Sequence, residues 1–148
     1  MIKIPAKVLI VDDEKDFVEM FSLRLQEAGQ KVFAAYNGKE GLEMLEAHPD
    51  VDVVVLDIKM PGMDGIETLQ EIKKKHPIVE VILLTGHGTI ETAVHGMKLG
   101  AYDYVLKPAD IEDFKNKLEA ARKRKEEQEE RIRKAEQKAM IRKSGEVY

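Results

Sequence analysis

Residues 51–65 read Val-Asp-Val-Val-Val-Leu-Asp-Ile-Lys-Met-Pro-Gly-Met-Asp-Gly and give the clearest indication of the fold. The apolar, β-branched run that ends at Leu56 predicts a short buried strand, and the Pro and Gly residues after it predict a loop. Asp57 therefore stands at the carboxyl end of a strand. Ligands of open α/β sheets bind at that edge, so Asp57 is the first candidate for a functional side chain.

Four more short apolar runs surround this one, and helical spacing of apolar residues follows each run. The predicted strands are 7–11, 31–36, 51–56, 80–84 and 102–106. The predicted helices cover 17–28, 41–47, a segment capped by Asp64 that stops before Pro77, a segment from a Thr89 cap to Gly100, and a last helix from Asp110. Five strand–helix alternations with short connections predict an α/β fold, a doubly wound parallel sheet covered on both faces. The pattern leaves the strand order open.

The last helix meets no breaker before Gly145, so it would be roughly 50 Å long. We expect its first apolar positions to dock on the sheet: Ile111, Phe114, Leu118 and Ala121. The later positions would form only a weak coiled-coil seam, because Lys125 and Gln128 interrupt it. We therefore divide the chain into a domain, 1–120, and a charged helical extension, 121–148.

Charge is distributed unevenly along the 148 residues. Residues 1–114 hold 12 Lys or Arg and 21 Asp or Glu, a net charge of −9, whereas residues 115–143 carry a net charge of +6. An acidic body makes nucleic acid an unlikely partner. There is no Cys, and no apolar run reaches the length of a membrane span. These features predict a soluble, cytoplasmic protein without disulfides or membrane contact.

Polar side chains stand at the carboxyl ends of four predicted strands. They are Asp12, Asp13, Asp57, Thr85 and Lys107. Parallel strands bring these ends to one edge, where three carboxylates would repel one another without a cation. Oxygen ligands with no His or Cys favour a hard ion, Mg²⁺ above all. A cation, an ammonium and a hydroxyl around one carboxylate are what a phosphoryl group on that carboxylate requires.

This constellation resembles the receiver domains of response regulators in two-component signalling. The resemblance covers residues 6 to about 120. It rests on Asp12-Asp13, on Asp57 followed by residues 60–65, on Thr85, on Tyr104, and on Lys107-Pro108. It implies a flavodoxin-like sheet of order 2-1-3-4-5 with an extended last helix. It also implies that Asp57 accepts phosphate from a sensor histidine kinase, as a switch and not as an enzyme.

The resemblance further implies a role for each matched residue. Asp13 and Asp57 would bind Mg²⁺ directly together with the backbone carbonyl of Lys59, and Asp12 would act through water. Lys107 would contact a phosphoryl oxygen, and Pro108 would follow a cis peptide. Thr85 would move to the phosphoryl group, and Tyr104 would swing inward behind it. The face formed by the fourth helix, fifth strand and last helix would then change, for dimerisation through the last helix or for binding another protein.

Several alternatives stay open. Asp12 and Asp13 could only cap a helix, Thr85 and Tyr104 could be ordinary strand residues, and His87 reads as a solvated loop residue. The last helix could be a spacer in a longer transcriptional regulator, with this chain its N-terminal part. The whole chain could be a structural adaptor that works without phosphorylation. A haloacid-dehalogenase phosphatase needs an Asp-x-Asp motif and a flavodoxin needs a phosphate-binding loop, and the adjacent acids after the first strand match neither.

Overall fold

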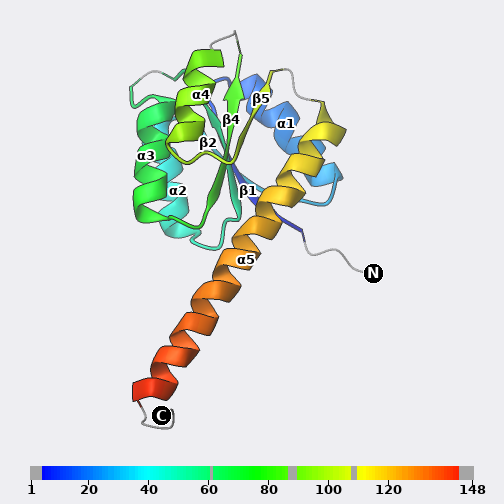
Figure 1. Ribbon diagram of the computed structural model, residues 1–148. Helices are drawn as coiled ribbons and strands as arrows, with labels where there is room; N and C mark the ends of the chain where they lie inside the picture. Colours follow the sequence, from blue (N-terminus) through cyan, green and yellow to red (C-terminus); the bar gives the residue numbers. More distant parts are fainter. Residues whose placement is uncertain (1–4, 61, 87–89, 108–109, 144–148) are drawn as a thin grey trace.

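Five parallel strands form one central sheet in the computed structural model (Figure 1). The structure describes residues 5–60, 62–86, 90–107 and 110–143. The strands are β1 (Lys7–Val11), β2 (Lys31–Ala35), β3 (Val53–Asp57), β4 (Glu80–Thr85) and β5 (Asp103–Leu106). Their order is β2-β1-β3-β4-β5, and all four pairings are parallel. The predicted fold class and strand order are confirmed.

Five helices cover the two faces of the sheet. They are α1 (Lys15–Glu27), α2 (Gly38–Ala47), α3 (Gly65–Lys75), α4 (Ile90–Lys98) and α5 (Ile111–Lys143). Residues of α1 and α5, such as Phe21 and Phe114, pack with one set of strand side chains. Leu45 of α2 and Leu69 of α3 pack with the set on the opposite face. The three inner strands are therefore buried on both sides, which explains their nearly continuous apolar sequence.

The observed boundaries differ slightly from the predicted ones. β3 begins at Val53 and includes Asp57, and just before it the Asp52 carboxylate accepts the Lys7 backbone N–H at 2.9 Å. Asn37 caps α2, because its side chain accepts from the Glu40 backbone N–H at 2.8 Å. The Asp64 cap of α3 is confirmed at 2.8 Å from the Glu67 nitrogen. The Thr89 cap lies outside the described residues.

The helix α5 extends well beyond the sheet (Figure 1). Phe114, Leu118 and Ala121 are buried as predicted, but Lys125 is buried too, with 5% of its surface exposed. Its Nζ lies 3.1 Å from the Asp52 carboxylate, so this position docks on the body instead of interrupting a coiled-coil seam. The division at residue 120 and the coiled coil remain predictions. Across the described residues, no helix combines the length and the apolar character needed to cross a membrane.

Candidate functional site

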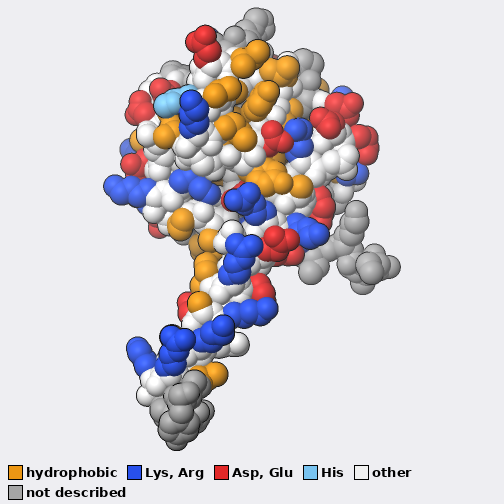
Figure 2. Space-filling view, in the orientation of Figure 1, with side chains coloured by type: hydrophobic (Ala, Val, Ile, Leu, Met, Phe, Trp, Pro, Cys, Tyr) orange, Lys and Arg blue, Asp and Glu red, His pale blue; other side chains and the backbone are white. Residues whose placement is uncertain are grey.

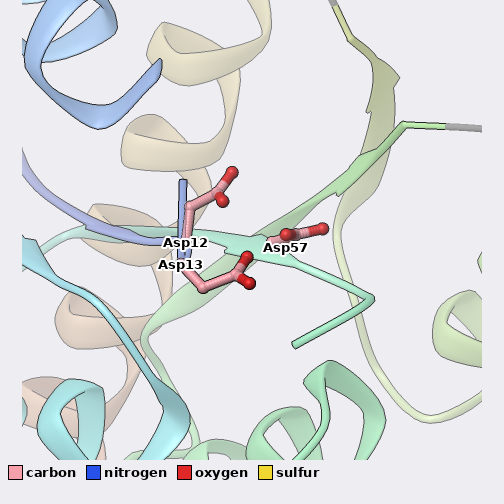
Figure 3. Close-up of side chains that lie close together, drawn as sticks. All are labelled: Asp12, Asp13 and Asp57. Carbon is pink, nitrogen blue, oxygen red and sulfur yellow. The ribbon is translucent and has the colours of Figure 1, made fainter. Parts of the chain in front are cut away.

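Three carboxylates meet at the carboxyl edge of the sheet (Figure 3). Asp12 and Asp13 follow β1, and Asp57 is the last residue of the neighbouring strand β3. One oxygen of each lies within 4.8 Å of the others. Asp12 and Asp57 are buried, whereas Asp13 is exposed. The structure therefore brings together the acids that the sequence predicted would converge.

Local sequence holds the loop after Asp57 close to this cluster. Gly65 begins α3, and a Cβ there would lie 2.3 Å from the Asp57 carbonyl oxygen. The Gly65 backbone N–H donates to the Ile58 carbonyl at 2.9 Å, which folds the loop back onto the strand end. Only glycine permits so close an approach of two backbones. Gly65 is therefore needed so that the loop after Asp57 can pack against the end of β3.

The environment of Asp57 disfavours its charged form. Burial and then the negative charge of Asp12 raise its pKa from 3.8 to about 7. The charge of Lys107 and a hydrogen bond from the Lys59 backbone N–H, at 3.2 Å, oppose this shift without cancelling it. A carboxylate in this state is under-neutralised, and an added cation would lower its free energy.

Lys107 is the residue directly after β5, and its side chain extends into the acidic cluster. Its Nζ lies 2.5 Å from an Asp12 oxygen, 3.0 Å from a Glu14 oxygen and 3.7 Å from an Asp57 oxygen. Burial lowers the pKa of this ammonium, but the hydrogen bonds to Asp12 and Glu14 and the charge of Asp57 outweigh burial, so the pKa is raised. Lys107 is therefore a fixed positive charge, as predicted from its position.

A cavity of about 210 Å³ opens beside these groups. Its walls are formed by Glu14, Asp57, Ile58, Lys59, Thr85, Gly86 and Lys107. Thr85 ends β4 next to Asp57 and is 5% exposed. Its hydroxyl oxygen is buried and has no hydrogen-bond partner within the described ranges. An unsatisfied hydroxyl in a polar cavity is one that a bound ligand could engage.

The structure does not bring every predicted residue into the cluster. Tyr104 is 38% exposed on β5, with only Val105 of that strand buried, so the aromatic ring faces outward. The Lys59 backbone N–H donates to the Asp57 carboxylate at 3.2 Å. Pro108 and its predicted cis peptide, and His87, lie outside the described residues. The roles assigned to these residues therefore stay predictions.

The donor set suits a hard divalent cation. Three carboxylates offer only oxygen atoms, which match the preferences of Mg²⁺. Asp12 is the least available of the three, because one oxygen pairs with Lys107 and the other accepts the Glu14 backbone N–H at 2.9 Å. Asp13 and Asp57 are the acids left to bind an ion. The residues present thus fit Mg²⁺.

Sequence reasoning missed two residues of the site. Glu14 contributes a fourth carboxylate, and the Phe17 ring lies beneath the Lys107 ammonium, 4.5 Å from ring centroid to Nζ. Phe17 looked like an ordinary apolar helix position. Glu14 directly follows the acidic pair, and that adjacency was the available signal. The acid could not be linked to Lys107 from sequence, because 93 positions separate them.

Comparisons with known proteins agree with this geometry. The family model described as the response regulator receiver domain matches residues 8–119. A response regulator named NtrX-like from Rickettsia bellii is 47% identical over 103 residues, covering 68% of this chain and 21% of that protein. The regulatory protein AtoC of Escherichia coli K12 is 40% identical over 109 residues, covering 73% of this chain and 23% of AtoC. This chain thus spans about a fifth to a quarter of these curated relatives.

Solved structures show the same likeness. A response regulator receiver domain from Clostridium thermocellum superposes with a TM-score of 0.79 and 38% identity, covering 82% of this chain and 97% of that one. NtrX from Brucella abortus gives a TM-score of 0.79 and 33% identity, covering 86% of this chain and 29% of that one. One similar chain matches over nearly its full length, and the other is much longer than the matched region.

Proposed function

The chain belongs to the response regulator receiver domain family, and from that membership we propose that Asp57 accepts a phosphoryl group from a phosphohistidine of a sensor histidine kinase. The observation that carries the proposal is the buried, under-neutralised Asp57 carboxylate, which shares a cavity with Thr85 and Lys107. The protein then acts as a phosphoacceptor switch and not as an enzyme that turns over a separate substrate.

In the transfer, an Asp57 carboxylate oxygen attacks phosphorus. A P–O bond forms, the P–N bond of the phosphohistidine breaks, and the imidazole nitrogen keeps the bonding electrons. Lys107 lies close enough to Asp57, at 3.7 Å, to reach an oxygen of the incoming group after a small movement. The Thr85 hydroxyl, which has no partner within the described ranges, can donate to another oxygen. Positioning and charge neutralisation carry most of such a transfer.

Mg²⁺ would be held by Asp13, Asp57 and the Lys59 carbonyl, with Asp12 acting through water. When bound, it would neutralise charge on the phosphoryl oxygens and on the acids. The two acids differ because both oxygens of Asp12 already have partners, the Lys107 ammonium and the Glu14 backbone N–H. The exposed Asp13 carboxylate is available to the ion. In this arrangement Asp12 keeps Lys107 in the site while the other two acids bind the ion.

The proposal is tested by incubating the protein with Mg²⁺ and a small phosphodonor such as acetyl phosphate and measuring the mass of the intact chain. We expect one added phosphoryl group that is lost in hydroxylamine, as an acyl phosphate would be. The Asp57→Asn variant should gain none. Asp103→Asn is the matched control, because Asp103 stands on β5 and pairs with Lys117 at 2.7 Å, away from the cluster. Labelling of Asp57→Asn at the wild-type level would refute the acceptor assignment.

We further propose that phosphorylation is read on the face of α4, β5 and α5. Large apolar side chains are exposed there: Ile90, Val94, Met97, Tyr104 and Leu106. They form the apolar patch over α4 and β5 in Figure 2. Movement of Thr85 toward the phosphoryl group, followed by an inward turn of Tyr104, would change this patch. The apolar area suits contact with a second copy or another protein.

The readout is tested by sedimentation of the phosphorylated and unphosphorylated chain, together with the Tyr104→Ala variant. We expect association to change on phosphorylation in the wild type and not in Tyr104→Ala. If neither association nor protein binding responds to phosphorylation, the proposed readout is wrong while the acceptor role stands.

A second candidate function is that of the receiver part of a longer regulator. The observation that favours it is the length of the relatives, of which this chain spans about a fifth to a quarter. A relative from Escherichia coli K12, 37% identical over 114 residues, is named transcriptional regulatory protein ZraR. That name weakens the expectation that nucleic acid plays no part, although any such contact is a proposal here. The mass of the protein isolated from its natural source distinguishes 16.8 kDa from a chain several times larger.

A further inference from the structure

The Lys107 ammonium is nearer to two other acids than to Asp57. Its Nζ lies 2.5 Å from Asp12 and 3.0 Å from Glu14, both within hydrogen-bond distance, but 3.7 Å from Asp57, which is beyond it. The Phe17 ring supports the same position, with its centroid 4.5 Å from Nζ. In this structure the ammonium is therefore held to one side of the carboxylate that is proposed to react.

The Glu14 carboxylate does not take part in capping α1. It occupies the N-cap position of α1, yet its side chain makes no capping hydrogen bond. Its own backbone N–H donates to Asp12 at 2.9 Å. The side chain extends instead across the mouth of the cavity to Lys107 and remains 65% exposed. Its direction is explained by Lys107 and by no interaction within α1.

We propose that Glu14 is a positioning residue that holds the Lys107 ammonium away from Asp57 and yields it when a phosphoryl group arrives. The proposal rests on the function assigned to Asp57. No bond is formed or broken at Glu14, and no proton is transferred. The ammonium exchanges one oxygen acceptor for another, because a phosphoryl oxygen that carries more charge competes better than a carboxylate that water already solvates. Glu14 would thereby slow phosphorylation of the resting protein.

The test compares phosphorylation of wild type and Glu14→Gln by acetyl phosphate with Mg²⁺, over a range of donor concentrations. Gln keeps the shape of the side chain but is a weaker acceptor, so Lys107 should lie more often at Asp57. We expect the maximal rate to rise about threefold, the factor expected for loss of an exposed ion pair. Affinity for beryllofluoride, which binds acceptor carboxylates as a phosphoryl mimic, should rise by a similar factor without any transfer step.

Two further variants separate contact from charge. Asp16→Asn removes the same charge from the exposed first turn of α1, where Asp16 lies without a role at Lys107. It should change only the donor concentration at half-maximal rate. Glu14→Asp keeps the charge at the mouth, but Asp is shorter and prefers to cap the helix, so it should raise the maximal rate as Gln does.

Three results would overturn the proposal. The first is an unchanged or lower maximal rate in Glu14→Gln. The second is an effect of Glu14→Gln that Asp16→Asn reproduces, which would assign it to charge at the mouth alone. The third is failure of the wild type itself to take up phosphate at Asp57, which removes the proposed function and this inference together. A wild type that is labelled, beside a Glu14→Gln variant that behaves identically, overturns only the role of Glu14.

Discussion

The two edges of the sheet both carry buried charge, but they balance it differently. At the carboxyl edge, Asp12, Asp57 and Glu14 share one ammonium, that of Lys107, and Asp13 adds a further carboxylate to the cluster. At the amino edge, the buried Glu80 lies 3.6 Å from Lys73 and 3.5 Å from Arg124, and Asp52 lies 3.1 Å from Lys125. Three carboxylates at the carboxyl edge thus depend on a single base, whereas Glu80 and Asp52 at the amino edge each have at least one base of their own.

This difference distinguishes a candidate ligand site from a set of ion pairs that only holds the fold together. Acids paired one by one with cations gain little from a further ion, and their pairs hold α5 and α3 to the strand starts. Where acids outnumber their cations, binding a further cation lowers the free energy of the site. Asp57 lies at such an edge, where burial and then the negative charge of Asp12 raise its pKa. A buried charge at a strand end therefore indicates function only where its counter-charge is missing. Three measurements test whether the two edges differ in this way.

The largest effect is expected at the amino edge. Lys125→Met removes the cation from a buried pair and leaves Asp52 uncompensated, so we expect the free energy of unfolding to fall by about 3 kcal/mol. Urea denaturation measures it. Lys123→Met, an exposed position on the same helix, should change the free energy of unfolding by less than about 0.5 kcal/mol. Phosphoryl uptake at Asp57 should be unchanged. A Lys125→Met variant as stable as wild type would show that the ion pair at the amino edge does not stabilise the fold.

At the carboxyl edge, we expect pH to have a smaller effect on the free energy of unfolding of the metal-free protein. The pKa of Asp57 is about 7 in the folded chain and near 3.8 when unfolded, so the folded state binds the extra proton between these values. Its contribution to stability is present below about pH 4 and is lost as the pH rises through 7. Replacing Asp57 by Asn should therefore stabilise the protein more at pH 8 than at pH 5, by roughly 2 to 3 kcal/mol.

The control for the pH experiment is Asp103→Asn, whose effect should not depend on pH over this range because Asp103 lies outside the acidic cluster. Equal stabilisation of Asp57→Asn at both pH values would mean that the acids at this edge are already neutralised.

The smallest of the three effects is that of magnesium. At a Mg²⁺ concentration about thirty times its dissociation constant, the free energy of unfolding should rise by roughly 2 kcal/mol. Asp13→Asn, at the carboxyl edge, should lose most of this gain, whereas Asp52→Asn, at the amino edge, should keep it. Thermal unfolding with and without Mg²⁺ measures both. The same gain in Asp13→Asn and wild type would place the ion away from the proposed site.

Much of the site followed from simple sequence rules. Asp12, Asp57, Thr85 and Lys107 each come at or after the end of an apolar run, and parallel strands share one carboxyl edge, so their convergence was predictable. The strand order was not, because the alternation of strands and helices is the same for several orders. It was expected only from the resemblance to receiver domains. The contacts of Glu14 and Lys125 escaped prediction, since each joins a helix to a segment 93 or 73 positions away.

Which residues form strands and helices, and which polar groups stand at the strand ends, could be read from the amino-acid order, because backbone periodicity and turn chemistry are local properties. The tertiary structure alone decided which acids are paired and which are left with excess charge. That balance depends on where α1 and α5 come to lie over the sheet, and a few ångströms at a side-chain tip separate a neutralised pair from an open site. The same residue types thus form stabilising ion pairs at one edge and a candidate phosphorylation site at the other.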